Sequence, residues 1–111
     1  KQKDTSGEEN TIAIPGFEKV TLYANETKQA VNFHNPEIND CYFKISLIHP
    51  DGSVLWISDL IEPGKGMYSI ELEKTLAVGE YENAVLKYEC FSLNDQSPLN
   101  GSEINLKLVV V

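Results

Sequence analysis

The fold is decided by residues 41–60, which read CYFKISLIHPDGSVLWISDL. Apolar and polar residues alternate on both sides of a short turn, and a period of two is typical of strands with one face on a core and one in water. Pro50-Asp51-Gly52 fits the common three-residue hairpin loop, in which a type I turn is followed by a left-handed glycine. This stretch therefore predicts a β-hairpin of residues 41–48 and 54–60.

The hairpin loop also predicts the direction of each side chain. It places Leu47 opposite Leu55, with both side chains toward the core. It leaves Ile48, Val54 and Trp56 together on the outer face, and a register slip of one residue would reverse the two faces. Exposed apolar clusters tend to mark interfaces, so these three residues form the expected partner surface. The alternative is that a neighbouring loop covers them.

Alternation with a period of two recurs along the rest of the chain. The alternating segments are residues 19–22, 31–34, 68–73, 86–89 and 104–110. Turn-forming residues such as Asn35-Pro36 and Glu62-Pro63-Gly64 separate them, and no segment has the apolar period of a convincing helix. The sequence therefore predicts an all-β, immunoglobulin-like β-sandwich of about seven antiparallel strands. We place this domain at residues 11–111.

Leu76, Gly79 and Tyr81 form the pattern Leu-x-x-Gly-x-Tyr. The pattern resembles the corner at the start of the penultimate strand in many bacterial immunoglobulin-like domains. The resemblance implies that Tyr81 is largely buried and that its hydroxyl bonds to the backbone near Leu76. With Asn35-Pro36 and the turns that follow it, the chain resembles small membrane-anchored or lipoprotein-like extracellular proteins of Gram-positive bacteria, whose function is not established. This likeness carries over no catalytic residue.

Two cysteines stand at the ends of predicted strands. Cys41 opens one strand and Cys90 closes another, and pairing them as antiparallel neighbours matches core-facing side chains along both strands. We therefore expect a Cys41–Cys90 disulfide, which would suit an extracellular protein. The same register puts Lys44 opposite Lys87. A register shifted by two residues pairs Lys44 with Glu89 instead and leaves two buried free thiols on a diagonal.

The charge balance excludes two function classes. Acidic side chains number 17 against 9 basic ones, which gives a net charge of −8, and every basic residue is lysine. Nucleic-acid binding needs basic patches and usually arginine, so it is excluded, as is contact of the domain itself with an anionic membrane. Residues 1–10 are polar and aperiodic, which predicts a flexible tether. We expect this tether to join a membrane anchor upstream of Lys1.

The sequence contains no recognisable catalytic or metal motif. His34 and His49 are the groups that titrate near neutral pH by default, and both fit surface positions. Two cysteines do not make a zinc site, and the calcium-binding spacing of an EF-hand is missing. We therefore expect no enzyme activity, no cofactor and no metal. The alternative is a calcium site in the loops that carry Asn39, Asp40 and Asp95.

These patterns predict a non-enzymatic extracellular binding or adhesion module that is tethered to a cell surface. Its expected partner is a protein or a glycan on a surface, and we expect the module to be a monomer. The alternative is a structural or spacer subunit that packs into a larger surface assembly through a sheet edge or the face of Trp56. An aromatic-lined groove would favour sugar binding, whereas a flat apolar sheet face would favour a protein partner.

Overall fold

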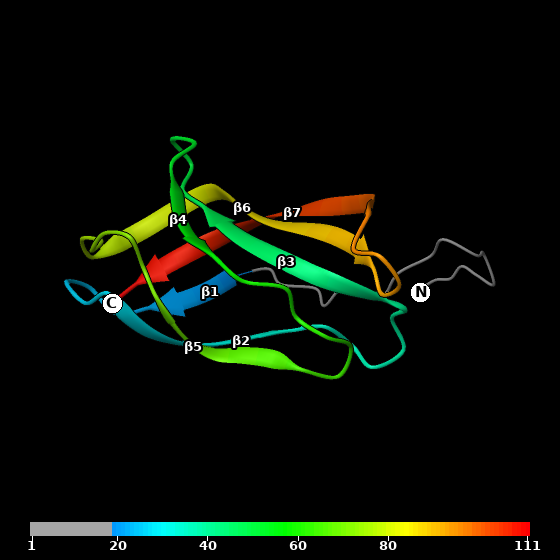
Figure 1. Cartoon of the computed structure of the whole chain (residues 1–111). Helices are drawn as coiled ribbons and strands as arrows, with labels where there is room; N and C mark the ends of the chain where they lie inside the picture. Colours follow the sequence, from blue (N-terminus) through cyan, green and yellow to red (C-terminus); the bar gives the residue numbers. More distant parts are fainter. Residues whose placement is uncertain (1–18) are drawn as a thin grey trace.

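The computed structural model describes residues 19–111 and shows an all-β chain with seven strands (Figure 1). The strands are β1 (Lys19–Leu22), β2 (Lys28–His34), β3 (Cys41–Ile48), β4 (Val54–Ile57), β5 (Gly66–Glu71), β6 (Gly79–Ser92) and β7 (Pro98–Val110). The predicted all-β class and strand number are confirmed. No helix in residues 19–111 is long and apolar enough to cross a membrane. The predicted tether at 1–10 and the domain boundary at residue 11 lie outside the described residues.

The strands form two sheets of unequal size. Five strands lie side by side in the order β1-β7-β6-β3-β4, and β2 and β5 form a separate pair. β1 runs parallel to β7, whereas the other pairs are antiparallel. The large sheet curls into a half-barrel, so the arrangement is not the clear sandwich of seven antiparallel strands that was predicted. Alternation locates strands but says nothing of their relative direction, which is why the parallel pair was missed.

The inward faces of both sheets build one core. Ile45, Leu47 and Leu86 are fully buried, as their alternation predicts. Phe33 of the small sheet meets Trp56 of the large sheet, with ring centroids 5.7 Å apart. Aromatic pairs at such distances add to the free energy gained by burial, so this contact helps to hold the two sheets together.

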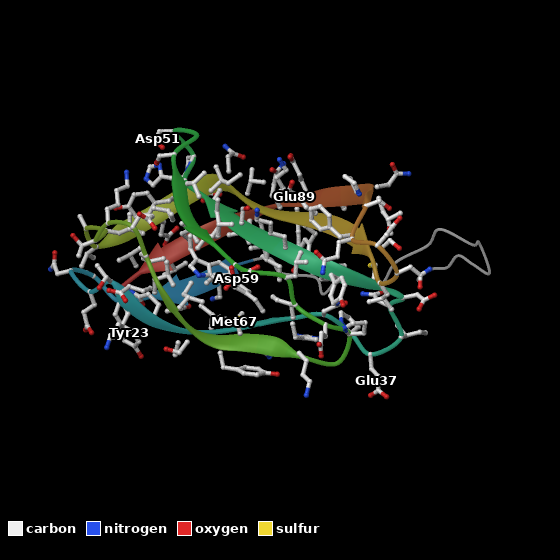
Figure 2. All side chains as sticks on the ribbon, viewed as in Figure 1. Tyr23, Glu37, Asp51, Asp59, Met67 and Glu89 are labelled. Carbon is white, nitrogen blue, oxygen red and sulfur yellow. The ribbon has the colours of Figure 1, made fainter. Side chains whose placement is uncertain are left out.

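The turn between β3 and β4 forms as predicted. Gly52 has a φ of 92°, and its N–H donates to the carbonyl of His49 at 2.8 Å. Asp51 lies at the tip of this hairpin, which projects away from the sheets (Figure 2). Directly after the turn Ile48 lies opposite Val54, which is also the predicted pairing.

One residue further along, a bulge in β4 shifts the register. Leu47 lies opposite Trp56 rather than Leu55, so Leu55 is the extra residue of the bulge. As a result Trp56 is 7% exposed and Ile57 is 50% exposed. The prediction that Trp56 lies on the outer face is therefore wrong, because a bulge moves all later side chains to the other face.

A buried asparagine joins three segments of the chain. Asn35, the residue directly after β2, is 0% exposed. Its side-chain amide donates to the carbonyls of Cys41 at 2.8 Å and Ile61 at 2.9 Å. Its side-chain oxygen accepts a hydrogen bond from Asn39 at 2.9 Å. Asn35 thus ties the end of the small sheet to the start of β3 and to the connection between β4 and β5.

Candidate functional site

The bulge breaks up the predicted partner surface of Ile48, Val54 and Trp56. Ile48 and Val54 lie opposite each other on the outer face, and Val54 is 41% exposed, but Trp56 lies in the core. Ile57 follows Trp56 on β4, and Val85 lies opposite Ile48 on β6. Both now stand on the same outer face. We call Ile48, Val54, Ile57 and Val85 the β4 patch.

The two cysteines adopt the shifted register rather than the one that was favoured. Cys41 lies opposite Ser92 and Phe43 opposite Cys90, so the sulfurs are diagonal neighbours. The cysteines are 4.0 Å apart, whereas a disulfide needs about 2 Å, so the predicted bond is absent from this structure. Lys44 faces Glu89 in this register. Avoiding the apposition of two lysines is the physical reason for the shift, because like charges directly opposite each other destabilise a sheet.

Both thiols are removed from water. Each cysteine is 2% exposed. Burial raises the pKa of Cys90 to about 12 and raises the pKa of Cys41, and a hydrogen bond links the two side chains. The thiolate is the reactive form of cysteine, so these two groups are poor nucleophiles in the folded state.

The corner pattern forms a local structural contact. The hydroxyl of Tyr81 donates to the carbonyl of Ala77 at 2.7 Å, next to Leu76 in sequence. The Tyr81 ring meets His49 edge-on with centroids 5.4 Å apart. Tyr81 is half-buried rather than largely buried, because it lies near the start of β6, where the strand leaves the core. Leu76 is buried and Gly79 opens the strand, so this motif shapes the local course of the chain.

Two of the three residues of the considered calcium site, Asn39 and Asp95, make local hydrogen bonds, and the third, Asp40, is exposed. Asn39 donates to Asn35, as described above. Asp95 accepts hydrogen bonds from the backbone and hydroxyl of Ser97 at 3.0 and 2.8 Å, which lowers the pKa of Asp95. Within residues 19–111, no group of three or more His, Cys, Asp or Glu side chains is placed to hold a metal ion.

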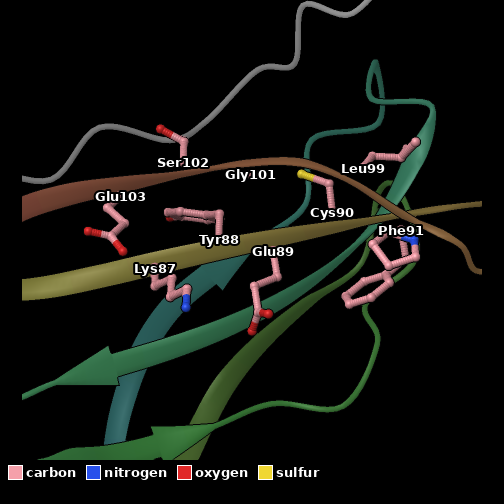
Figure 3. A pocket seen from close by; sticks show the side chains of 10 residues that line it. Lys87, Tyr88, Glu89, Cys90, Phe91, Leu99, Gly101, Ser102 and Glu103 are labelled. Atoms are coloured by element: carbon pink, nitrogen blue, oxygen red, sulfur yellow. The ribbon is translucent and has the colours of Figure 1, made fainter.

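Two surface pockets share the side chain of Phe91. The first has a volume of about 360 Å³ and is shown in Figure 3; it is lined by Lys87, Tyr88, Glu89, Cys90, Phe91, Pro98, Leu99, Gly101, Ser102 and Glu103. The second has a volume of about 280 Å³ and is lined by Lys44, Ser58, Asp59, Leu60, Phe91 and Gln96. Both volumes lie near the lower end of the range for small-molecule sites. We call the two pockets together the Phe91 site.

Charged groups of both signs surround the ring. Lys44 faces Glu89 across β3 and β6, and Lys87 faces Glu103 across β6 and β7. In Figure 3, Lys87 and Glu89 extend from one side of β6, while Tyr88 and Cys90 extend from the other. The Phe91 site therefore offers one half-buried aromatic surface with hydrogen-bond donors and acceptors around it.

The first pocket lies where β7 bulges against β6. The pairing shifts between Tyr88 and Cys90, and Gly101 comes close to the backbone of β6. A Cβ on Gly101 would collide with the carbonyl oxygen of Tyr88 and lie 3.3 Å from the Cα of Glu89. This close approach requires glycine.

The ring of Tyr88 is buried at the same place. Tyr88 is 0% exposed, and its hydroxyl finds no hydrogen-bond partner among residues 19–111. Burial raises the pKa of Tyr88, so the hydroxyl stays protonated. An unpaired buried hydroxyl destabilises the folded state by about 1–3 kcal/mol.

We expect Tyr88→Phe to raise the free energy of unfolding by about 1 kcal/mol. The substitution removes the unpaired hydroxyl and keeps the ring, whose centroid lies 5.2 Å from that of Phe43 in an edge-on contact. Urea denaturation measures the effect as a higher midpoint with an unchanged slope. Tyr81→Phe is the matched control, and its midpoint should fall because it loses the bond to Ala77. A lower midpoint for Tyr88→Phe would show that this hydroxyl has a partner in solution.

The Phe91 site was not predicted, although one signal was present. Alternation that turns Tyr88 and Cys90 inward turns Phe91 outward, and an aromatic side chain on the solvent face is a candidate binding residue. The rest of the site depends on residues far apart in sequence, such as Asp59 and Gln96. Comparison with known proteins finds no relative: no protein-family model, no curated protein and no solved structure matches the chain.

Proposed function

We propose that this protein is a non-enzymatic extracellular binding module, held at a cell surface, and that it binds a glycan at the Phe91 site. The observation that carries the proposal is that two pockets share one aromatic ring and are lined by lysine, carboxylate and amide side chains. A sugar ring has an apolar face of C–H groups and a rim of hydroxyls. Phe91 suits the face, and Lys44, Asp59 and Gln96 suit the rim, because ligand sites combine apolar walls with a few polar groups.

The distribution of strands supports an immunoglobulin-like origin for the domain. In immunoglobulin domains the third, sixth and seventh core strands share one sheet, and the second and fifth lie in the other. Here β3, β6 and β7 share the large sheet, and β2 and β5 form the small one. The bond from Tyr81 to the backbone at the start of the sixth strand is a second point of agreement. Many members of this architecture serve as binding domains at cell surfaces, which fits the proposed location.

We expect Phe91→Ala to weaken binding of a saccharide at least tenfold, or about 1.4 kcal/mol. The probes are a panel of neutral, anionic and amino mono- and disaccharides. They are titrated into the ¹⁵N-labelled 111-residue chain, and binding is followed by two-dimensional NMR. A bound saccharide should shift the amides of Lys44, Gln96 and Leu99, which line the two pockets. The loss in Phe91→Ala measures the contribution of the ring.

Ile57→Ala is the matched control for this titration. Ile57 is a 50% exposed apolar side chain of the same sheet that lies outside both pockets, so binding should not change. Amides of the Phe91 site that do not respond to any saccharide at millimolar concentration would overturn the proposal. Equal binding by Phe91→Ala and the parent chain would also overturn it.

The β4 patch supports a second candidate, a structural subunit of a surface assembly. β4 is an edge strand of the large sheet, and Val54 and Ile57 on it are 41% and 50% exposed. Exposed apolar side chains on a sheet edge favour contact with another protein. In that case Ile57→Ala, and not Phe91→Ala, would weaken the interaction, so the same pair of variants separates the two functions.

A further inference from the structure

The geometry points to Cys41 and Cys90 as a dithiol pair that closes to an intramolecular disulfide when a disulfide oxidant is supplied, and the folded sheet favours this closure. The proposal does not depend on the Phe91 site being a glycan site. It also differs from the disulfide expected from the sequence, which would join two cysteines directly opposite each other. Here the two cysteines are diagonal neighbours on β3 and β6.

Proximity is the first reason. The sulfur-bearing side chains are 4.0 Å apart and hydrogen-bonded, and both point into the core from neighbouring strands. In the unfolded chain the same two groups are the ends of a loop of about 50 residues, whose closure is entropically unfavourable. Folding therefore removes most of the entropic barrier to pairing them.

The position of the pair within the sheet is the second reason. Cys41 is the first residue of β3, and Cys90 lies beside the irregular pairing of β6 with β7. Strand ends and bulges are the parts of a sheet that adjust most easily, so the sulfurs can approach each other by small movements there. The carbonyl of Cys41 accepts a hydrogen bond from Asn35, which restrains β3 there, so we expect most of the adjustment on the side of Cys90.

One of the two cysteines borders a surface pocket. Cys90 lines the first pocket of the Phe91 site, although it is 2% exposed (Figure 3). In the reaction with oxidised glutathione, the thiolate of Cys90 attacks the glutathione disulfide and releases one reduced glutathione. Cys41 then attacks the mixed disulfide, and the second glutathione leaves. The two protein thiols lose two protons and two electrons, and one glutathione disulfide becomes two thiols.

The rate should be slow in the folded state. Burial disfavours both thiolates, and the thiolate is the attacking species. Equilibrium measurements over long incubations are therefore the appropriate test, because they report the preference of the fold and not the speed of exchange.

The experiment equilibrates the 111-residue chain in glutathione buffers of stepped redox ratio, both in native buffer and in about 8 M urea, which unfolds the chain. Acid quenching, alkylation of free thiols and intact mass give the oxidised fraction. At half-oxidation, the squared concentration of reduced glutathione divided by the concentration of oxidised glutathione equals the equilibrium constant of the exchange. We expect this quantity to be at least tenfold higher in native buffer than in urea. By linkage, the disulfide then stabilises the fold by at least about 1.4 kcal/mol.

Controls separate the bridge from other products. Cys41→Ser and Cys90→Ser each keep one thiol and should show no species that has lost two hydrogens. The oxidised parent chain should keep the blue fluorescence of buried Trp56, which reports an intact core. The proposal would be overturned if half-oxidation in native buffer occurred at the same glutathione composition as in urea, or at a less reducing one. Oxidation that is accompanied by unfolding, or mixed disulfides at both cysteines in place of a bridge, would overturn it as well.

Discussion

Replacing Trp56 with alanine is expected to lower the free energy of unfolding by about 3–5 kcal/mol. Trp56 is 7% exposed, faces Leu47 across the sheet and contacts Phe33 of the small sheet at 5.7 Å between ring centroids. The truncation removes a large buried surface and leaves a cavity between the two sheets. Urea denaturation followed by circular dichroism measures the loss, because the variant lacks tryptophan fluorescence.

Ile57→Ala is the control for this experiment. Ile57 is the next residue on β4 and is 50% exposed, so its truncation should change the stability by less than about 1 kcal/mol. The contrast between adjacent residues tests the bulge directly. A small loss for Trp56→Ala together with a large loss for Ile57→Ala would restore the register without a bulge, in which Trp56 lies outside.

Asn35→Ala should be comparably destabilising, by about 3–5 kcal/mol. The substitution leaves the buried carbonyl of Cys41 without this donor and breaks the bond to Asn39. It also takes one of two donors from the carbonyl of Ile61, which keeps the N–H of Phe43. Each unpaired buried group destabilises by about 1–3 kcal/mol, and water has poor access to a residue that is 0% exposed. The free energy of unfolding in urea gives the magnitude.

Two further variants sharpen the interpretation of Asn35→Ala. Asn32→Ala removes an exposed asparagine of β2, the strand that precedes Asn35, so its effect should stay within about 0.5 kcal/mol. The double variant Asn35→Ala/Asn39→Ala should lose less than the sum of the two single losses, because the two side chains bond to each other. Additive losses would show that the network does not act as a unit.

Local signals in the sequence were sufficient to predict the strands and the turn that contains Gly52. The register of β4 was not predictable in the same way. Val54, Leu55, Trp56 and Ile57 are all apolar, so alternation within this run cannot show which residue is the extra one of a bulge. The turn therefore predicted the pair of Ile48 and Val54 correctly. The next predicted pair, Leu47 with Leu55, was wrong.

The cysteines show a different limit. Two registers of β3 and β6 were compatible with the apolar pattern, because a shift of two residues keeps every side chain on its own face. The charges decided between them, with Lys44 opposite Glu89 in the structure. The Phe91 site could not be predicted from strand alternation or charge pairing. Its residues Lys44, Asp59 and Gln96 come together only through the packing of distant segments.

The parallel pairing of β1 with β7 has a mechanical consequence. Lys19 lies beside Lys107 and Leu22 beside Val110, and further backbone bonds join Ala24 and Leu22 to Val111. A pull on the chain ahead of β1 and an opposite pull at the end of β7 act along the strands in opposite directions. Such a force loads these hydrogen bonds in shear, all at once, instead of opening them one after another. The parallel pair therefore resists force that is applied at these two strand ends.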